Sequence, residues 1–421
     1  MGLSILRAAT LEGWNCALVE AESDLLSHAS GSNSGIACTG VDASPGTLER
    51  ALIRDSVSQL RMFCKSMGVP MRPCGSLVCS WPWDDNDAEN LDSVLEESHS
   101  AGDTHASMLS SSQVRLLEPN LYSGCTSAVH IPGEIVLDPW LYSTALAAHA
   151  RENGADIFTN FKFDPDSSNF ENGLWKVVEK SAPMNSSAAR TIKAKAVVNA
   201  AGLSADEVQS RVLGASPWVA KPRRGQYRLY RANKGTKVIH PIQPIPTQRT
   251  KGIFIFSTVY KNILVVGPTA LDQNSKTDRS VDSLVAKELE CHLKRVLPGV
   301  DVESDYVADY VGIRPGSDKR DYQIHAYPRR NWVAVAAIRS TGLTASLGIG
   351  SYVVRQLQMM LDAPISKQET KTTPLPSVPN MIREFRDSGG YVTIGGNRYR
   401  VTHPLTAFSW QVANSVATSS L

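Results

Sequence analysis

The first twenty residues constrain the fold most. An apolar helical pattern covers residues 3–12, Gly13 follows as a C-terminal stop, and a short apolar strand at 16–19 ends at Glu20. A helix that leads directly into a short, buried strand is typical of α/β proteins with a parallel sheet. The start of the chain therefore predicts the α/β class.

Gly2 and Glu20 have the spacing of a nucleotide site. In a dinucleotide-binding βαβ unit, the last glycine of G-x-G-x-x-G opens the helix, and an acid about 20 residues further on binds the adenosine ribose. This spacing also occurs by chance in many α/β proteins. The strand and the two glycines that normally precede the helix are not in the chain, so a start placed too far downstream and a truncated, noncatalytic isoform both stay open.

A run of small and hydroxylated residues, HASGSNSGIACTG, occupies positions 28–40. One interpretation is an ordinary surface loop. The other is a backbone that passes close to phosphates and a flavin ring, where small side chains, hydroxyls and amides offer hydrogen bonds without bulk. The residues concerned are Ser30, Gly31, Asn33, Ser34 and Gly35.

The remaining pattern alternates strands and helices. Helices are expected at about 47–68, 139–152 and 281–296, and period-two alternation at 155–202 predicts a β-meander that returns to a parallel strand. A strand and a helix follow at 332–362. Near the C-terminus, YVTIGGNRYRV predicts a hairpin with a Gly-Gly turn.

Composition excludes several classes of protein. The 43 basic and 41 acidic residues give a net charge of +2, so no charge excess favours a nucleic-acid partner. Seven scattered cysteines without a Cys-x-x-Cys pair argue against a disulfide framework and a zinc site, and we expect no metal. No apolar run approaches the length of a transmembrane helix, which leaves peripheral membrane contact open.

Three ordered segments carry a family resemblance: ASGSNSGIACTG (29–40), AVVNAAGLSADEV (196–208) and VAVAAIRSTGLTASLGIGSYVVRQL (333–357). On these the chain is identified as a member of the D-amino-acid-oxidase-like superfamily of FAD-dependent oxidoreductases. The superfamily includes glycine oxidase, L-2-hydroxyglutarate dehydrogenase and FAD-linked glycerol-3-phosphate dehydrogenase. KPRRGQYRLY, TKGIFIFSTVYKNILVVGPTA and DYVGIRPGSDKRDYQI resemble the branch of the two dehydrogenases.

The resemblance implies a glutathione-reductase-type, Rossmann-like FAD domain interleaved with a mixed-sheet substrate domain. We expect the FAD domain at 1–80, 140–215 and 325–362, and the substrate domain at 81–139 and 216–324. Residues 363–421 would form a C-terminal tail that carries the hairpin. It contains no cysteine, so it cannot ligate an iron–sulfur cluster through thiolates.

The resemblance also implies which residues hold FAD, which we expect to be bound noncovalently. Ala337 stands where relatives commonly have glycine. The N-terminus of the last helix would face the flavin edge on which negative charge accumulates. The residues assigned to the cofactor are Gly2, Glu20, Ser30, Gly31, Asn33, Ser34, Gly35, Ala200, Ala201, Gly202, Ser340, Thr341, Gly342, Leu343 and Thr344.

Arg314 and Arg339 are the expected substrate ligands, because each follows a strand that would end over the flavin and a guanidinium matches a carboxylate or phosphate bidentately. Lys251 and Tyr227 would complete the anion pocket. His240 and His325 are the candidates for a general base.

The implied function is oxidation of the CH–OH group of a small anionic substrate, such as glycerol 3-phosphate or a 2-hydroxy acid, by hydride transfer to flavin. Electrons would pass to a quinone or to oxygen. Oxidation of an amine or amino acid is the alternative within the superfamily, and a noncatalytic isoform is the alternative outside it. The family resemblance implies a mitochondrial location, and a cytoplasmic location is the alternative.

Overall fold

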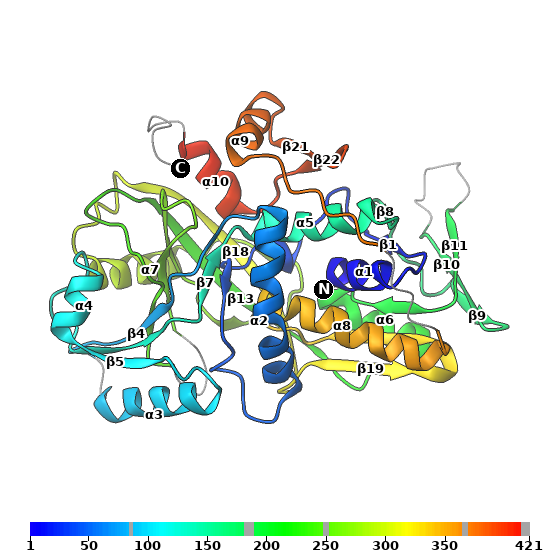
Figure 1. Cartoon of the computed structure of the whole chain (residues 1–421), viewed down its shortest axis with the longest axis horizontal. Coiled ribbons are helices and arrows are strands. Elements are labelled where there is room, and N and C mark those ends of the chain that lie inside the picture. The colour runs from blue at the N-terminus through cyan, green and yellow to red at the C-terminus, as the bar shows by residue number, and fades with distance from the viewer. Residues whose placement is uncertain (84–86, 181–188, 247–251, 364–368, 414–421) are drawn as a thin grey trace.

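The structure is a computed structural model that describes residues 1–83, 87–180, 189–246, 252–363 and 369–413 (Figure 1). Its helices and strands form a mixed α/β architecture, which confirms the predicted class. The helices are α1 (Gly2–Leu11), α2 (Leu48–Met67), α3 (Asp87–Ser100), α4 (Ser111–Leu117), α5 (Pro139–Glu152), α6 (Ala205–Leu213), α7 (Ser283–Val296), α8 (Gly342–Leu361), α9 (Val378–Asp387) and α10 (Pro404–Val412), with 3-10 turns η1 (Ala29–Gly31), η2 (Gly202–Ser204) and η3 (Pro328–Arg330).

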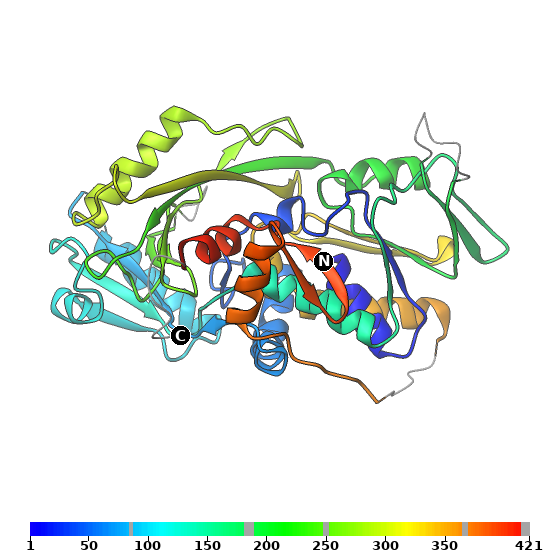
Figure 2. The same ribbon diagram turned by 90° about the horizontal axis from the view of Figure 1, so that it is seen from above.

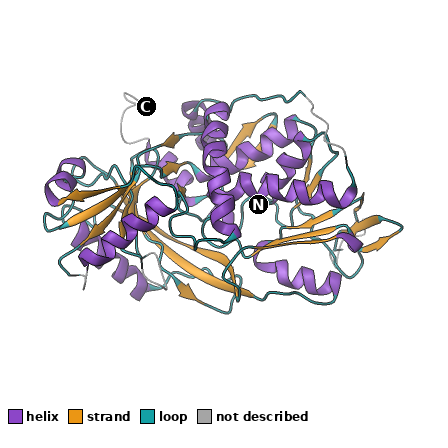
Figure 3. Cartoon of the chain, turned by 60° about the horizontal axis from the view of Figure 1, so that its bottom comes forward, coloured by secondary structure: helices purple, strands orange, loops and turns teal. Residues whose placement is uncertain are grey.

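One half of the molecule holds α1, α6 and α8 with several small sheets (Figures 1 and 3). β1 pairs in parallel with β8, and β12 pairs in parallel with β20, which pairs antiparallel with β19. The meander β9–β10–β11 is antiparallel, and β12 follows it, as the period-two pattern predicts. These strands are β1 (Ala17–Val19), β8 (Asp156–Phe158), β9 (Asn169–Glu171), β10 (Leu174–Val178), β11 (Thr191–Ala194), β12 (Val197–Asn199), β19 (Gln323–Tyr327) and β20 (Trp332–Ala336).

The other half is built on a nine-stranded mixed sheet with α3, α4 and α7 around it (Figure 1). Its order is β17-β13-β16-β15-β14-β4-β6-β5, and β18 also pairs with β13. β2 (Ile36–Ala37), β7 (Ile135–Leu137) and β3 (Met71–Arg72) form a separate small sheet. The large sheet comprises β4 (Ser76–Ser80), β5 (Ser107–Ser110), β6 (Ser127–Ile131), β13 (Ala220–Arg231), β14 (Ile242–Pro244), β15 (Ile255–Ser257), β16 (Ile263–Val266), β17 (Leu271–Asp272) and β18 (Tyr306–Ser317).

The segment between β17 and α7 ties the two halves together. Lys276 Nζ lies 2.9 Å from Asp206 Oδ1 and 2.5 Å from Glu207 Oε1, both on α6. Arg279 donates to the carbonyl of Ser27 at 2.8 Å. These contacts anchor a loop of the sheet half to two separate segments of the helical half.

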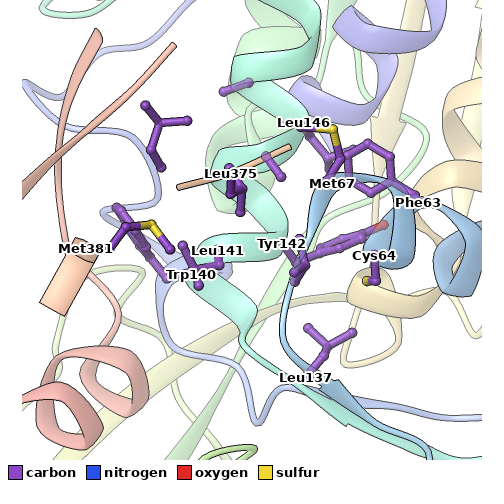
Figure 4. Close-up of a cluster of buried hydrophobic side chains, with 14 of the residues drawn as sticks. Phe63, Cys64, Met67, Leu137, Trp140, Leu141, Tyr142, Leu146, Leu375 and Met381 are labelled. Atoms are coloured by element: carbon purple, nitrogen blue, oxygen red, sulfur yellow. The ribbon is translucent and has the colours of Figure 1, made fainter. Parts of the chain in front are cut away.

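The C-terminal segment packs into the main hydrophobic core. The hairpin β21 (Tyr391–Ile394) and β22 (Asn397–Arg400) turns through two glycines at positive φ and lies with α9 and α10 beside α5 (Figure 2). Figure 4 shows Leu375 and Met381 among side chains of α2 and α5. The core members shown there are Phe63, Cys64, Met67, Leu137, Trp140, Leu141, Tyr142, Leu146, Leu375 and Met381.

Among the described residues, no helix combines the length and apolar character that crossing a membrane requires. In the same residues, no three His, Cys, Asp or Glu side chains gather as metal ligands.

Candidate active site

A cavity of about 1320 Å³ brings together segments that lie far apart in the sequence. It lies between the strands β13 and β18 of the large sheet, the loop around η1, the end of β12 and the N-terminus of α8. Its volume exceeds the roughly 300–1,000 Å³ of typical small-molecule sites, so it has room for more than a small substrate. The predicted residues on its lining are Ser30, Asn33, Ser34, Ala200, Gly202, Tyr227, Arg314, Arg339, Ser340, Thr341, Gly342 and Leu343.

Other predicted residues lie off this lining and have local structural roles. A Cβ on Gly31 would lie 1.7 Å from the carbonyl oxygen of Leu26, and Gly35 has φ +70° with the carbonyl of Leu137 2.7 Å from its would-be Cβ. Only glycine fits such approaches. Thr344 Oγ1 accepts a hydrogen bond from the Cys38 amide at 3.0 Å. Ala201 also lies off the lining, and Lys251 falls outside the described residues.

Gly2 and Glu20 do not line the cavity, although Met1 and Leu3 on either side of Gly2 do. A Cβ on Gly2 would lie 3.3 Å from Leu18 Cδ1 on β1 and 3.9 Å from Ala200 Cβ after β12, so α1 begins close to both strands. Glu20 follows β1, and its carboxylate accepts from the Glu22 amide at 3.0 Å. The helix start, β1 and the acid follow one another in the order that a dinucleotide unit has, and their role in binding FAD stays a prediction.

The N-terminus of α8 opens onto the cavity through Thr341, Gly342 and Leu343. The first amides of a helix lack intrahelical partners and carry the positive end of its dipole, so this end attracts negative charge. Ala337 enters the preceding turn at φ +58°, in the left-handed region. Its methyl group is buried at 3% exposure, so alanine occupies a glycine conformation beside the cavity.

Arg314 is held with its guanidinium on the cavity wall. Its Nη2 donates to the carbonyl of Thr269 at 3.0 Å, and its guanidinium interacts electrostatically with the neighbouring Tyr227. Gly225 leaves room for it, since a Cβ there would lie 2.8 Å from Nη2. Burial lowers the pKa of Arg314, and Tyr227 opposes that shift.

Within the described residues, no ion pair joins Arg314 to a carboxylate, so its remaining donors are available to an anion. Tyr227 is fixed by stacking on Tyr310, with ring centroids 4.5 Å apart and planes 6° apart. Burial raises the pKa of Tyr227, which therefore keeps its proton and can donate.

Arg339 lines the same cavity in a different electrostatic setting. Its Nη2 donates to the carboxylate of Glu49 at the start of α2. Glu49 is 4% exposed and also lines the cavity. The positive charge of Arg339 is thus paired, whereas that of Arg314 is not.

Several lining residues were missed by the sequence analysis. Gln243 on β14 donates to Glu134 Oε2 at 2.8 Å, and both side chains are buried on the lining. A single polar residue in an apolar strand was the available signal for Gln243. Glu49 gave no signal, because an acid in the first turn of a helix is ordinary.

Neither histidine proposed as a base lines the cavity. His240 Nδ1 lies 2.8 Å from Glu118 Oε1, and His325 stacks on Trp218 at 5.8 Å between ring centroids. Of the residues that the structure describes, no histidine is on the lining. Both predicted histidines have structural partners instead.

The chemical groups on the lining are of the kinds that bind a flavin dinucleotide. The η1 loop contributes Ser30, Asn33 and Ser34, which offer hydroxyl and amide groups, and α8 offers a helix N-terminus to an electron-rich edge. Arg314 and Tyr227, which the sequence predicts as substrate ligands, line the same space. Cofactor and anionic substrate would therefore meet in one cavity.

Comparison with known proteins decides the family. The model of the DAO family, described as FAD dependent oxidoreductase, matches residues 1–356. The chain belongs to the DAO family of FAD-dependent oxidoreductases. The protein is therefore an FAD-dependent oxidoreductase, which confirms the prediction from the sequence motifs.

Relatives within the DAO family include dehydrogenases and oxidases. A glycerol 3-phosphate dehydrogenase of Caloramator mitchellensis is 29% identical over 92% of this chain and 78% of its own length. A glycerol 3-phosphate oxidase of Mycoplasma pneumoniae is 28% identical over 82% of this chain and 88% of its own. The mitochondrial L-2-hydroxyglutarate dehydrogenase of Mus musculus is 24% identical over 64% of this chain and 59% of its own length.

Solved structures of the DAO family share the fold. The reduced L-α-glycerophosphate oxidase of Mycoplasma pneumoniae, with FAD bound, superposes with a TM-score of 0.76 at 24% identity, over 89% of this chain and 96% of that one. Glycine oxidase of Bacillus cereus gives a TM-score of 0.72 at 19% identity, over 87% and 95%. The fold thus hosts both alcohol and amine oxidation.

Proposed function

We propose that this protein oxidises the secondary alcohol of a small anionic substrate, with glycerol 3-phosphate as the first candidate. The observation that carries the proposal is Arg314, a guanidinium on the cavity wall without a carboxylate partner in the described residues and with Tyr227 beside it. Such a group binds a phosphate or carboxylate bidentately. The glycerol 3-phosphate relatives support the choice of substrate.

The chain supplies position and charge for the reaction. FAD, when bound, would supply the acceptor for the hydride of the carbinol carbon, and the hydroxyl proton would pass to solvent. Arg314 and Tyr227 hold the anionic end, which fixes the direction of the C–H bond. The N-terminus of α8 stabilises negative charge that develops on the cavity side facing it.

Anaerobic titration of the purified holoprotein tests the proposal. We expect glycerol 3-phosphate to bleach the visible flavin absorbance, and subsequent addition of oxygen or a soluble quinone to restore it, which identifies the acceptor. Glycine and sarcosine are tested as amine substrates in parallel, because a glycine oxidase shares this fold. Bleaching by an amine alone would overturn the proposed substrate class, and no bleaching by any substrate would favour a noncatalytic chain.

A further inference from the structure

Glu49 holds a network at the wall of the cavity. Its carboxylate accepts from Arg339 through Oε2 and from Thr341 Oγ1 at 2.6 Å through Oε1. The hydroxyl of Tyr322 lies 2.6 Å from Thr341 Oγ1. Since Thr341 gives its only proton to Glu49, Tyr322 donates to Thr341, so two donors reach the carboxylate and the third supports one of them.

The backbone position of Glu49 is also fixed. The Asp321 carboxylate accepts from the amides of Leu48 at 2.7 Å and of Glu49 at 2.9 Å, which caps α2. Further along, α2 packs so closely on α8 that a Cβ on Gly348 would lie 2.4 Å from the carbonyl of Leu52. The backbone of Glu49 is therefore held in place by Asp321 and by the packing of α2 on α8.

Arg339 itself is less constrained. Its side chain is 41% exposed, compared with 6% for the side chain of Glu49. An exposed guanidinium on a flexible stem is free to bind a carboxylate of a ligand unless a protein carboxylate already occupies it. Glu49 is that carboxylate, so Arg339 is already paired, unlike Arg314, which has no carboxylate partner in the described residues.

We propose that Glu49 is a specificity-determining positioning residue, which pairs Arg339 and so makes the cavity select substrates with one anionic end over 2-hydroxy dicarboxylic acids. A dicarboxylate brings a second charge that requires its own cation. Other cations, such as Lys221 and Arg320, also line the cavity, but a carboxylate placed beside Arg339 meets the Glu49–Arg339 pair instead of a free guanidinium. This inference rests on the proposed assignment of Arg314 to the anionic end of the substrate.

The test compares Glu49→Gln with the wild-type holoenzyme. Glutamine keeps a carbonyl oxygen for Thr341, but its amide nitrogen cannot accept from Arg339, which becomes available. Dissociation constants for glutarate, an unreactive dicarboxylate, and for glycerol 3-phosphate are measured by isothermal titration calorimetry. We expect the ratio of the glutarate constant to the glycerol 3-phosphate constant to fall about tenfold, as one freed guanidinium binds the second carboxylate.

Three further variants test whether the effect depends on the Glu49–Arg339 pair. Glu97→Gln removes an exposed carboxylate from the cavity rim without touching Arg339, and we expect it to leave the ratio unchanged. The double variant Glu49→Gln/Arg339→Gln is expected to return the ratio to the wild-type value. Glu49→Asp, which keeps the charge but shortens the stem, should shift the ratio in the same direction by less, and it serves if Glu49→Gln does not fold.

An unchanged ratio in both Glu49 variants, or a shifted ratio that survives the loss of Arg339, would overturn the proposal. Equal weakening of both ligands would assign Glu49 a purely structural role, which also overturns it. The readout is binding and does not need turnover. A chain that binds glycerol 3-phosphate without flavin bleaching therefore refutes the proposed reaction alone, and the ratio still tests Glu49.

Discussion

Arg314 lies within β18 and Arg339 follows β20, and both side chains line one cavity, yet their neighbours give them different roles. Arg314 contacts a carbonyl and a tyrosine, and Arg339 contacts the carboxylate of Glu49. The sequence predicts both arginines, although it expects Arg314 just after a strand and that residue lies within β18. It does not show the partner of Arg339, which lies 290 residues away in the chain.

Replacing Arg314 by lysine tests its role directly. Lysine keeps the charge but loses the planar fork, so we expect the dissociation constant of glycerol 3-phosphate to rise by about 10- to 100-fold, which corresponds to one charged hydrogen bond of about 1.5–3 kcal/mol. Flavin content should stay at the wild-type level. The matched control is Arg320→Lys, an exposed arginine on the cavity rim. Equal effects of the two variants would contradict a specific role for Arg314.

At the scale of elements, the contact of α2 with α8 depends on a missing side chain. A Cβ on Gly348 would lie 2.4 Å from the Leu52 carbonyl and 3.4 Å from Ser56 Cβ. Gly348→Ala must push the helices apart, and we expect it to lower the free energy of unfolding by about 1–3 kcal/mol, as overpacking does. Met359→Ala, at a 71% exposed position of α8, should change it by less than about 0.5 kcal/mol. Chemical denaturation of both holoproteins checks this, and similar losses would refute it.

α10 begins at a buried histidine that should make stability depend on pH. His403 Nδ1 accepts from the Leu405 amide at 3.2 Å, and burial lowers the pKa of His403 from 6.5 to about 3. The unfolded chain therefore takes up the proton first, so stability is fully present above pH 6.5 and is lost as the pH falls toward 3.

We expect this histidine to remove about 2 kcal/mol of stability between pH 7.5 and pH 5. His403→Asn retains an N-cap acceptor but cannot titrate, so its free energy of unfolding should fall less over the same interval. Urea denaturation at the two pH values measures the difference between the slopes. Identical slopes in the two proteins would show that His403 is not the titrating group.

For the whole molecule, the sequence predicts individual helices and strands better than the cavity at which they come together. Local patterns give α2, α5, α7 and the C-terminal hairpin closely, because helical and period-two spacing are properties of neighbouring residues. Ser34, Gly202 and Gly342 line one cavity because the tertiary fold brings them together. Their local sequence patterns do not show this, and only the family resemblance predicts it. Ala337 at positive φ shows the same limit, since its conformation is imposed by the turn into α8 and not by its own preference.

Because residues from both halves of the molecule line the cavity, loss of FAD should destabilise both halves. We expect bromide dialysis or acid precipitation to release the flavin, as noncovalent binding requires, and the apoprotein to melt at a lower temperature. A ligand at 100 times its dissociation constant adds about 2.7 kcal/mol of stability. Hydrogen exchange should increase at residues 28–35 and 337–343, which adjoin the cavity, while β5 and β6, whose strand residues do not line it, stay protected. Added FAD should restore both readouts, whereas flavin that stays with the denatured chain would refute noncovalent binding.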